Sequence, residues 1–276
     1  MITLSAMRSL LYLPASNPRA IAHARESAAD LVILDLEDAV KPEEKVSART
    51  AAVDAVASEW PMPVAIRVNG AGTEWHSLDI DAVARSTVQF AVLPRAESAH
   101  MVHGVAEAIG KPLLAMIESP AGVLAAAEIA QECAALIAGT NDLRVGLGVP
   151  IDSDRSPIAT ALQTIVLAAR AAGIAVFDGV FNDLEDLDGF TAQCAEGRRL
   201  GFDGKSLIHP KQIEPCNRSF SPSEEEIERA MRLIEAYGGG AERFEGQMIE
   251  RMHVEAARQL LERARHPGDS RDLRSD

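Results

Sequence analysis

The chain has 276 residues, and 41 Asp and Glu residues against 27 Lys and Arg residues give it a formal net charge of −14 at pH 7. This surplus of negative charge argues against nonspecific binding to nucleic acid or to an anionic membrane, because both are negatively charged themselves. If the substrate is an anion, local Arg and Lys side chains must counter the overall field.

The amino-terminal residues contain one short apolar run, with Arg8 at its leading edge and no cleavage-site pattern after it. This pattern predicts neither a signal peptide nor a membrane span. The three cysteines, Cys133, Cys194 and Cys216, are far apart and lack the spacing of a metal site. We therefore expect a cytoplasmic protein with reduced thiols.

Eight short apolar runs alternate along the chain with longer, Ala-rich segments of helical spacing. The runs cover residues 8–15, 30–38, 63–69, 89–95, 111–119, 134–144, 174–183 and 204–210. Helices are expected between most of them, the first over 18–29 with Asn17 as its N-cap. Eight strands, each followed by a helix, predict an α/β fold, a (β/α)₈ TIM barrel over residues 1–220, with a C-terminal helical extension over 221–276.

An open, doubly wound sheet is the competing architecture, because it shows the same alternation of strands and helices. Such a sheet usually carries a glycine-rich turn after its first strand. Here that turn reads LPASNP and has no glycine, so the sequence favours the barrel.

Two carboxylates follow neighbouring strands in the stretch 111–144. Glu118 follows the run at 113–117, and Asp142 follows the run at 134–138. Because parallel strands bring their carboxyl ends to the same side, we expect the two acids to meet there. With neither His nor Cys beside them, they indicate an oxygen-only site for a hard divalent cation such as Mg²⁺.

Charged or polar side chains also lie at the carboxyl ends of the other apolar runs, except the first. The active site of a barrel enzyme lies at these strand ends. They are Asp35, Glu37, Asp38, Arg67, Asn69, Arg95, Asp183 and His209. The same pattern arises where strands simply emerge into solvent. His209 can equally form a local hydrogen bond, and the acids after Asp183 can equally stabilise a helix start.

Several motifs together resemble the citrate lyase β-subunit-like family of acyl-CoA lyases, relatives of malyl-CoA and citramalyl-CoA lyases. They are RSLLYLPA, DLVILDLEDAV, KPEEKVSAR, AIRVN, AVLPRAES, AMIESPAG, GTNDL, LIHPKQI and FEGQMIE, in this order. The resemblance implies a (β/α)₈ barrel that cleaves or forms a C–C bond beside a CoA thioester with Mg²⁺. It also implies a trimer or hexamer in which a C-terminal lid reaches a neighbouring subunit's active site.

The resemblance assigns roles to residues of the barrel motifs. Glu118 and Asp142 match the family's metal ligands, and Asp38 resembles a further acid near the metal. Arg67 of AIRVN matches the arginine beside the thioester carbonyl.

The same resemblance assigns three basic residues to the CoA phosphates and adenine end. They are Arg8, Lys45 and Arg49. For Lys45 and Arg49 the competing interpretation is a solvated helix face with ion pairs to acids one turn away.

Two positions depart from the family pattern. Arg95 stands where many relatives have Lys, which keeps the charge but changes the hydrogen-bond geometry. In the lid motif, Glu250 stands where the family often has an Asp acid/base. Its extra methylene makes it either a repositioned catalytic acid/base or an exposed residue on a helix expected over 247–263.

These features predict a Mg²⁺-dependent lyase for a 3-hydroxy-3-carboxy acyl-CoA, such as citramalyl-, malyl- or citryl-CoA. The expected products are acetyl-CoA and a 2-oxo acid. One alternative is a class II 2-oxo acid aldolase, which uses the same metal pair without CoA. Another is a citrate lyase β subunit acting on a carrier-bound thioester, with the charged C-terminal helices as a docking face.

Overall fold

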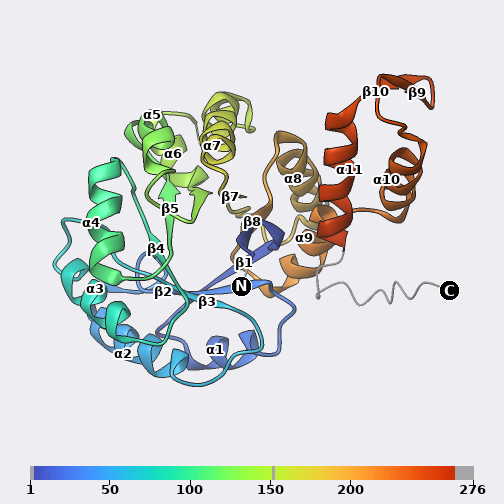
Figure 1. Cartoon of the computed structure of the whole chain (residues 1–276). Coiled ribbons are helices and arrows are strands. Elements are labelled where there is room, and N and C mark those ends of the chain that lie inside the picture. Colours follow the sequence, from blue (N-terminus) through green and yellow to red (C-terminus); the bar gives the residue numbers. More distant parts are fainter. Residues whose placement is uncertain (1–2, 151–152, 265–276) are drawn as a thin grey trace. The chain divides into compact units, whose positions relative to one another are not determined.

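The eight apolar runs form the parallel strands of a closed barrel in the computed structural model (Figure 1). The structure describes residues 3–150 and 153–264. Each strand pairs with the next, and β8 returns to β1 with Lys205 beside Ser9, which confirms the predicted barrel. The strands are β1 (Ser9–Pro14), β2 (Leu31–Asp35), β3 (Val64–Arg67), β4 (Phe90–Leu93), β5 (Leu113–Ile117), β6 (Ala135–Ala138), β7 (Ala175–Asp178) and β8 (Gly204–Leu207).

Helices follow the strands and surround the barrel (Figure 1). Seven of them are α1 (Pro18–Ala24), α2 (Lys45–Val56), α3 (His76–Arg85), α4 (Ala99–Ile109), α5 (Pro120–Ile129), α7 (Ala159–Ala172) and α8 (Leu187–Leu200). The short helix α6 (Thr140–Gly146) starts two residues after β6, so its first turn remains near the carboxyl end of that strand.

Local side-chain contacts set the bounds of α1. The predicted N-cap is confirmed, because Asn17 Oδ1 accepts a hydrogen bond from the Ala20 N–H at 3.1 Å. The helix ends at Ala24 rather than at residue 29. There the Ser27 hydroxyl donates to the Ala24 carbonyl at 2.7 Å and so satisfies it outside the helix.

The inner face of the barrel changes from apolar to polar toward the carboxyl ends of the strands. Leu10, Ile33 and Ala65 belong to the buried inner core. Because strand side chains alternate between faces, the residues two positions further along point to the same side. Those residues are Tyr12, Asp35 and Arg67. A polar floor therefore replaces the core at this end of the barrel.

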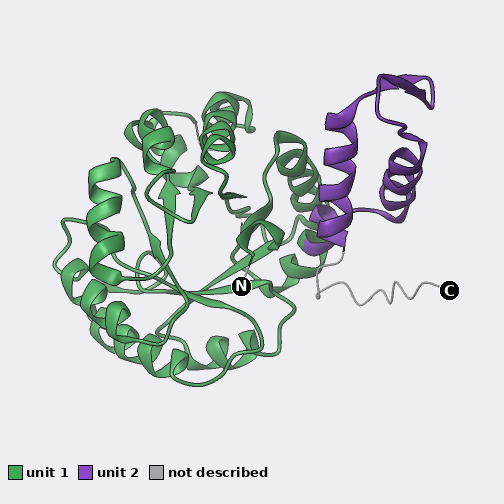
Figure 2. Ribbon diagram, viewed as in Figure 1, with its two compact units in different colours: residues 1–216 green, residues 217–276 purple. Residues whose placement is uncertain are grey.

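The chain divides into two compact units, Met1–Cys216 and Asn217–Asp276 (Figure 2). The division lies within α9 (Ile213–Phe220), four residues before the boundary expected from the sequence. In the part of the chain that the structure describes, no helix is both long and apolar enough to cross a membrane.

After the end of α9, the described residues of the second unit form two helices and a two-stranded antiparallel sheet. The elements are α10 (Glu224–Ala236), β9 (Glu242–Phe244), β10 (Gln247–Ile249) and α11 (Arg251–Ala264). The prediction of one helix over 247–263 is wrong at its start, because residues 247–249 pair with β9. Ala230, Leu233, Ile249 and Val254 share a buried cluster, which gives this unit a core of its own.

Candidate active site

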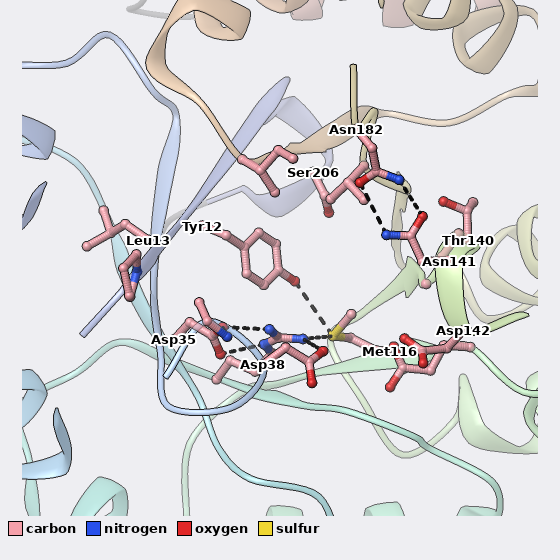
Figure 3. A pocket seen from close by; sticks show the side chains of 18 residues that line it. Tyr12, Leu13, Asp35, Asp38, Met116, Thr140, Asn141, Asp142, Asn182 and Ser206 are labelled. Carbon is pink, nitrogen blue, oxygen red and sulfur yellow. Dashed lines mark hydrogen bonds and ion pairs between the residues drawn. The ribbon is translucent and has the colours of Figure 1, made fainter. Parts of the chain in front are cut away.

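A pocket of about 330 Å³ opens at the carboxyl ends of the barrel strands (Figure 3). Three of the predicted site residues line it together, namely Arg67 from the end of β3, Glu118 after β5 and Asp142 in α6. The expectation that the two acids would meet is confirmed. This is the end at which barrel enzymes carry their chemistry.

Glu118 is held in place by backbone on two sides. Its Oε1 accepts a hydrogen bond from the Arg95 N–H at 2.6 Å, and Arg95 has a left-handed backbone with φ of 49°. Gly139 lies against the carboxylate, and a Cβ at that position would overlap Glu118 Cβ and Oε2. The side chain is 4% exposed, so it reaches the pocket from a buried position.

The electrostatics of Glu118 favour a cation nearby. Its pKa is raised to about 7: burial is the main cause, the Arg95 N–H and the Arg67 guanidinium oppose the rise, and Asp142 and Asp38 add to it. Asp142, by contrast, is exposed in the first turn of α6. A divalent cation between these two carboxylates would neutralise the charge that burial disfavours.

The donor set fits Mg²⁺ with a substrate. Within residues 3–150 and 153–264, no group of three or more His, Cys, Asp and Glu residues is arranged to hold a metal ion. A metal ion here would have Glu118 and Asp142 as its protein ligands and would take its other ligands from water and substrate. Mg²⁺ is commonly bound in this way, through one or two carboxylates.

Arg67 lies in the floor of the pocket in a fixed orientation. Its Nε and Nη2 each donate to one oxygen of Asp35, both at 2.6 Å. Its Nη1 lies 2.7 Å from Glu37 Oε2, and its guanidinium carbon lies 5.2 Å from the centre of the Tyr12 ring. Such a bidentate pair leaves the guanidinium little freedom to turn.

Acids outnumber cations in this pocket. Its lining includes the carboxylates Asp35, Asp38, Glu118 and Asp142 and the single guanidinium of Arg67. Behind them, burial raises the pKa of Glu37 to about 8, and Arg67 only partly opposes this rise. Ionisation of all these acids together is therefore unfavourable in the pocket, and a bound cation would make it favourable.

The model of the HpcH/HpaI aldolase/citrate lyase family matches residues 8–210. The chain belongs to this family. It is 42% identical to a protein named (3S)-malyl-CoA thioesterase from Cereibacter sphaeroides, over 93% of this chain and 94% of that protein. It is 34% identical to the citrate lyase subunit beta of Haemophilus influenzae, over 94% and 97% of the two chains.

Solved structures of the family agree with the fold. The crystal structure of CitE from Mycobacterium tuberculosis, in complex with magnesium, acetoacetate and coenzyme A, superposes with a TM-score of 0.85. Its sequence is 34% identical, and the match covers 95% of this chain and 99% of that one. The barrel described above is thus the architecture of a family of lyases.

In this member of the family, Arg8 lies away from the pocket. It precedes β1, and its side chain pairs with Asp30, just before β2, through Nε at 2.9 Å and Nη2 at 3.0 Å. Both residues therefore lie at the amino-terminal end of the barrel, opposite the pocket. Contrary to the expectation from the sequence, the structure does not bring Arg8 to the site.

Lys45 and Arg49 of α2 belong to a buried polar network. Lys45 Nζ donates to Asn69 Oδ1 at 2.6 Å and to the Glu37 carbonyl at 2.7 Å. Arg49 Nε donates at 2.6 Å to Asp79, which also accepts from Asn69. Lys45 is 6% exposed, so the interpretation as a solvated helix face is wrong for it. In this structure the network supports the loop that carries Glu37, and a role in CoA binding stays a prediction.

Glu250 lies in the second unit, at the start of α11. Its backbone N–H donates to His253 Nδ1 at 3.0 Å, and its carbonyl accepts from the His253 N–H at 3.0 Å. These contacts form a turn that begins the helix. The role of Glu250 as an acid/base stays a prediction.

Sequence reasoning missed two further features of this end of the barrel. Tyr12 lines the pocket, and the alternation of RSLLYLPA could have placed it on the inner face beside Leu10. Asp178 is fully buried between Arg155, at 2.6 Å, and Lys205, at 3.0 Å. The acid inside the otherwise apolar stretch IAVFDGVF and the lysine inside the run GKSLIHP were the signs of this second group in the sequence.

Proposed function

We propose that this chain is a Mg²⁺-dependent acyl-CoA lyase. It would cleave or form the C–C bond of a 3-hydroxy-3-carboxy acyl-CoA, such as citramalyl-, malyl- or citryl-CoA, to give acetyl-CoA and a 2-oxo acid. The observation that carries the proposal is the pocket in which acids surround one fixed guanidinium. A metal ion and the carbonyl of a thioester would each meet a suitable group there.

Glu118 and Asp142 would hold the metal. Bound Mg²⁺ would bind the hydroxyl and carboxylate of the substrate and lower the hydroxyl pKa. The match to a CitE structure that contains magnesium, acetoacetate and coenzyme A supports this assignment. The protein's own part is to keep Glu118 in place, through the Arg95 N–H and the absence of a side chain at Gly139.

Arg67 would act where charge develops. Cleavage would pass the proton of the substrate hydroxyl to solvent water, convert that carbon to a carbonyl and leave the electrons of the broken C–C bond on the thioester enolate. Arg67 Nη1, which also lies 2.7 Å from Glu37 Oε2, would donate to this negative oxygen, while Asp35 holds the other two nitrogens. Because Arg67 is already oriented, its hydrogen bond to the enolate oxygen would lower the activation free energy of C–C cleavage.

Glu250 would complete the reaction. In its protonated form it would donate a proton to the enolate carbon and so release acetyl-CoA; in the condensing direction its carboxylate would remove that proton. We expect a homo-oligomer, a trimer or hexamer, in the cytoplasm, in which this unit serves the site of a neighbouring subunit. Mixing Asp142→Ala and Glu250→Gln subunits should restore part of the turnover that each variant lacks alone.

The decisive assay offers citramalyl-, malyl- and citryl-CoA to the protein, each with Mg²⁺ and with EDTA. Acetyl-CoA and a 2-oxo acid in equal amounts, formed only with metal, are the expected result. Turnover that continues at the same rate in EDTA would overturn the assignment of the metal. An aldol product from pyruvate and an aldehyde, without CoA-ester cleavage, would favour the aldolase reaction instead.

Hydrolysis of the thioester is a second candidate, favoured by the 42% identity to a protein named (3S)-malyl-CoA thioesterase. In that reaction water adds to the thioester carbonyl and the CoA thiolate leaves, so malyl-CoA gives malate and CoA. The same assay separates the two reactions. Free thiol without acetyl-CoA or 2-oxo acid indicates hydrolysis, and acetyl-CoA with glyoxylate indicates cleavage of the C–C bond.

A further inference from the structure

Two hydrogen-bond donors in the pocket point at one weak acceptor. Tyr12 Oη lies 3.7 Å from Met116 Sδ, and Arg67 Nη1 lies 3.9 Å from the same sulfur. Figure 3 shows the dashed line from Tyr12 ending on the sulfur of Met116. A thioether sulfur accepts hydrogen bonds poorly, whereas a buried phenol or guanidinium usually finds an oxygen. Arg67 Nη1 carries two N–H bonds, so it can donate one to Glu37 Oε2, 2.7 Å away, and direct the other at Met116. The position beside Met116 Sδ where this N–H and the Tyr12 hydroxyl converge is therefore suited to an oxygen of a bound ligand.

The two donors are held in a fixed relation. The Tyr12 ring lies over Arg67 at 5.2 Å, and Asp35 binds Arg67 through two of its nitrogens. Tyr12 comes from β1 and Arg67 from β3, so both are anchored in the barrel rather than in a loop. Donors on rigid elements need little reorganisation when charge appears near them.

The phenol also keeps its proton. Burial raises the pKa of Tyr12 above its usual value, and the Arg67 guanidinium and a hydrogen bond with Ser206 only partly oppose this rise. Tyr12 is thus a neutral donor at physiological pH.

We propose that Tyr12 Oη and Arg67 Nη1 bind the same oxygen of the acyl-CoA, the thioester carbonyl oxygen that becomes the enolate oxygen. This inference rests on the proposed lyase function and adds a second donor to it. Tyr12 contributes most when the negative charge has developed, so it acts on kcat more than on KM. Removing one donor of such a pair costs roughly 10²-fold in rate.

The test is Tyr12→Phe, which keeps the ring over Arg67 and removes only the hydroxyl. We expect kcat for the substrate found above to fall by roughly 10²-fold, KM to change by less than about threefold, and the unfolding midpoint to stay the same. The matched control is Tyr237→Phe, which removes a phenol from the second unit's core and should keep kcat/KM within about twofold of wild type.

A second readout follows the enolate without C–C cleavage. Exchange of the acetyl-CoA methyl protons into D₂O, with Mg²⁺ present, should slow in Tyr12→Phe by a similar factor. If wild type is active and Tyr12→Phe matches it in both assays, the role of Tyr12 is overturned while the lyase function stands. A raised KM with unchanged kcat would also overturn it, because Tyr12 would then bind the ground state. If wild type neither cleaves nor exchanges, both proposals fail together.

Discussion

Two groups of charged side chains lie at the carboxyl ends of the barrel strands, and they differ in the ratio of acidic to basic side chains. In the pocket, four carboxylates line a space with one guanidinium, and burial raises the pKa of Glu118 to about 7. In the second group, Asp178 lies between Arg155 and Lys205. Burial alone would raise the pKa of Asp178, but its two cationic neighbours hold it below its usual value.

The difference separates a site from a structural ion cluster. Asp178 has all of its charge compensated by the protein, so it needs no ligand to be stable in its position. The Glu118 carboxylate has a backbone donor and other acids beside it, so its charged form needs a cation from outside. Both residues are buried acids in strand-end positions, and only their partners distinguish them.

The largest expected effect comes from taking one acid out of the pocket. Asp142→Ala should lower Mg²⁺-dependent turnover by about 10³-fold or more, because the metal would lose one of its two protein ligands and its stabilisation of the transition state. Steady-state kinetics across a Mg²⁺ titration measure this. The control is Asp54→Ala, an exposed acid on α2, which should act like wild type. Equal turnover in both variants would refute the metal assignment.

Breaking the balanced cluster should affect stability rather than chemistry. Asp178→Asn leaves Arg155 and Lys205 buried without their counter-charge, so we expect the free energy of unfolding at neutral pH to fall by about 3–5 kcal/mol. Urea denaturation measures this fall. The control is Asp81→Asn, which breaks an exposed pair with Arg85 and should cost no more than about 0.5 kcal/mol.

The pH dependence gives the same variant a second test. Because folding lowers the pKa of Asp178, its contribution to stability is complete above the usual aspartate pKa of 3.8 and is lost as pH falls through the lower pKa of the folded state. Asp178→Asn lacks this loss. The gap in stability between wild type and variant should therefore narrow below pH 4; a gap that widens there would contradict the assigned ion pairs.

A smaller effect is expected from crowding the Glu118 carboxylate. Gly139→Ala would place a methyl group onto Glu118, so the carboxylate must move and turnover should fall by about 10²-fold. The matched control is Gly104→Ala on α4, where a Cβ meets no atom within 4 Å. Wild-type kinetics for Gly139→Ala would show that the carboxylate position is not critical.

The smallest expected effect is stabilisation by the metal itself. At a Mg²⁺ concentration ten times its Kd, wild type should gain about 1.4 kcal/mol, which thermal unfolding would record as a rise of a few degrees. Glu118→Gln should show no such rise at the same concentration. Its Tm in EDTA serves as the reference, and an equal rise in both proteins would place the metal elsewhere.

Much of the fold could be predicted because it depends on local patterns. The eight apolar runs gave the strands in their order, and Asn17 with Pro18 gave the start of α1. The pattern failed where tertiary pairing decides the structure. Residues 247–249 have helical neighbours in sequence but pair with β9 across a turn with two left-handed residues, Glu245 and Gly246.

The site could be predicted only where topology alone brings residues together. Glu118 and Asp142 meet because neighbouring parallel strands end on the same side. The environment of Lys45 could not be predicted in this way, since its partner Asn69 comes from a different strand end and two backbone carbonyls complete the contact. The expectation for Arg8 came from the motif resemblance, whereas its position just before β1 places it at the amino-terminal end of the barrel, where Asp30 holds it.

The hydrogen bond from the Arg95 N–H to Glu118 determines which substitutions at residue 95 the site can accept. The donor at residue 95 is a backbone N–H in a left-handed turn, so a substitution of the side chain there does not remove the hydrogen bond to Glu118. Gly and Asn adopt that backbone more easily than Arg, and both would preserve the donor. The contact that holds Glu118 thus depends on the backbone conformation at residue 95, and not on which side chain residue 95 carries.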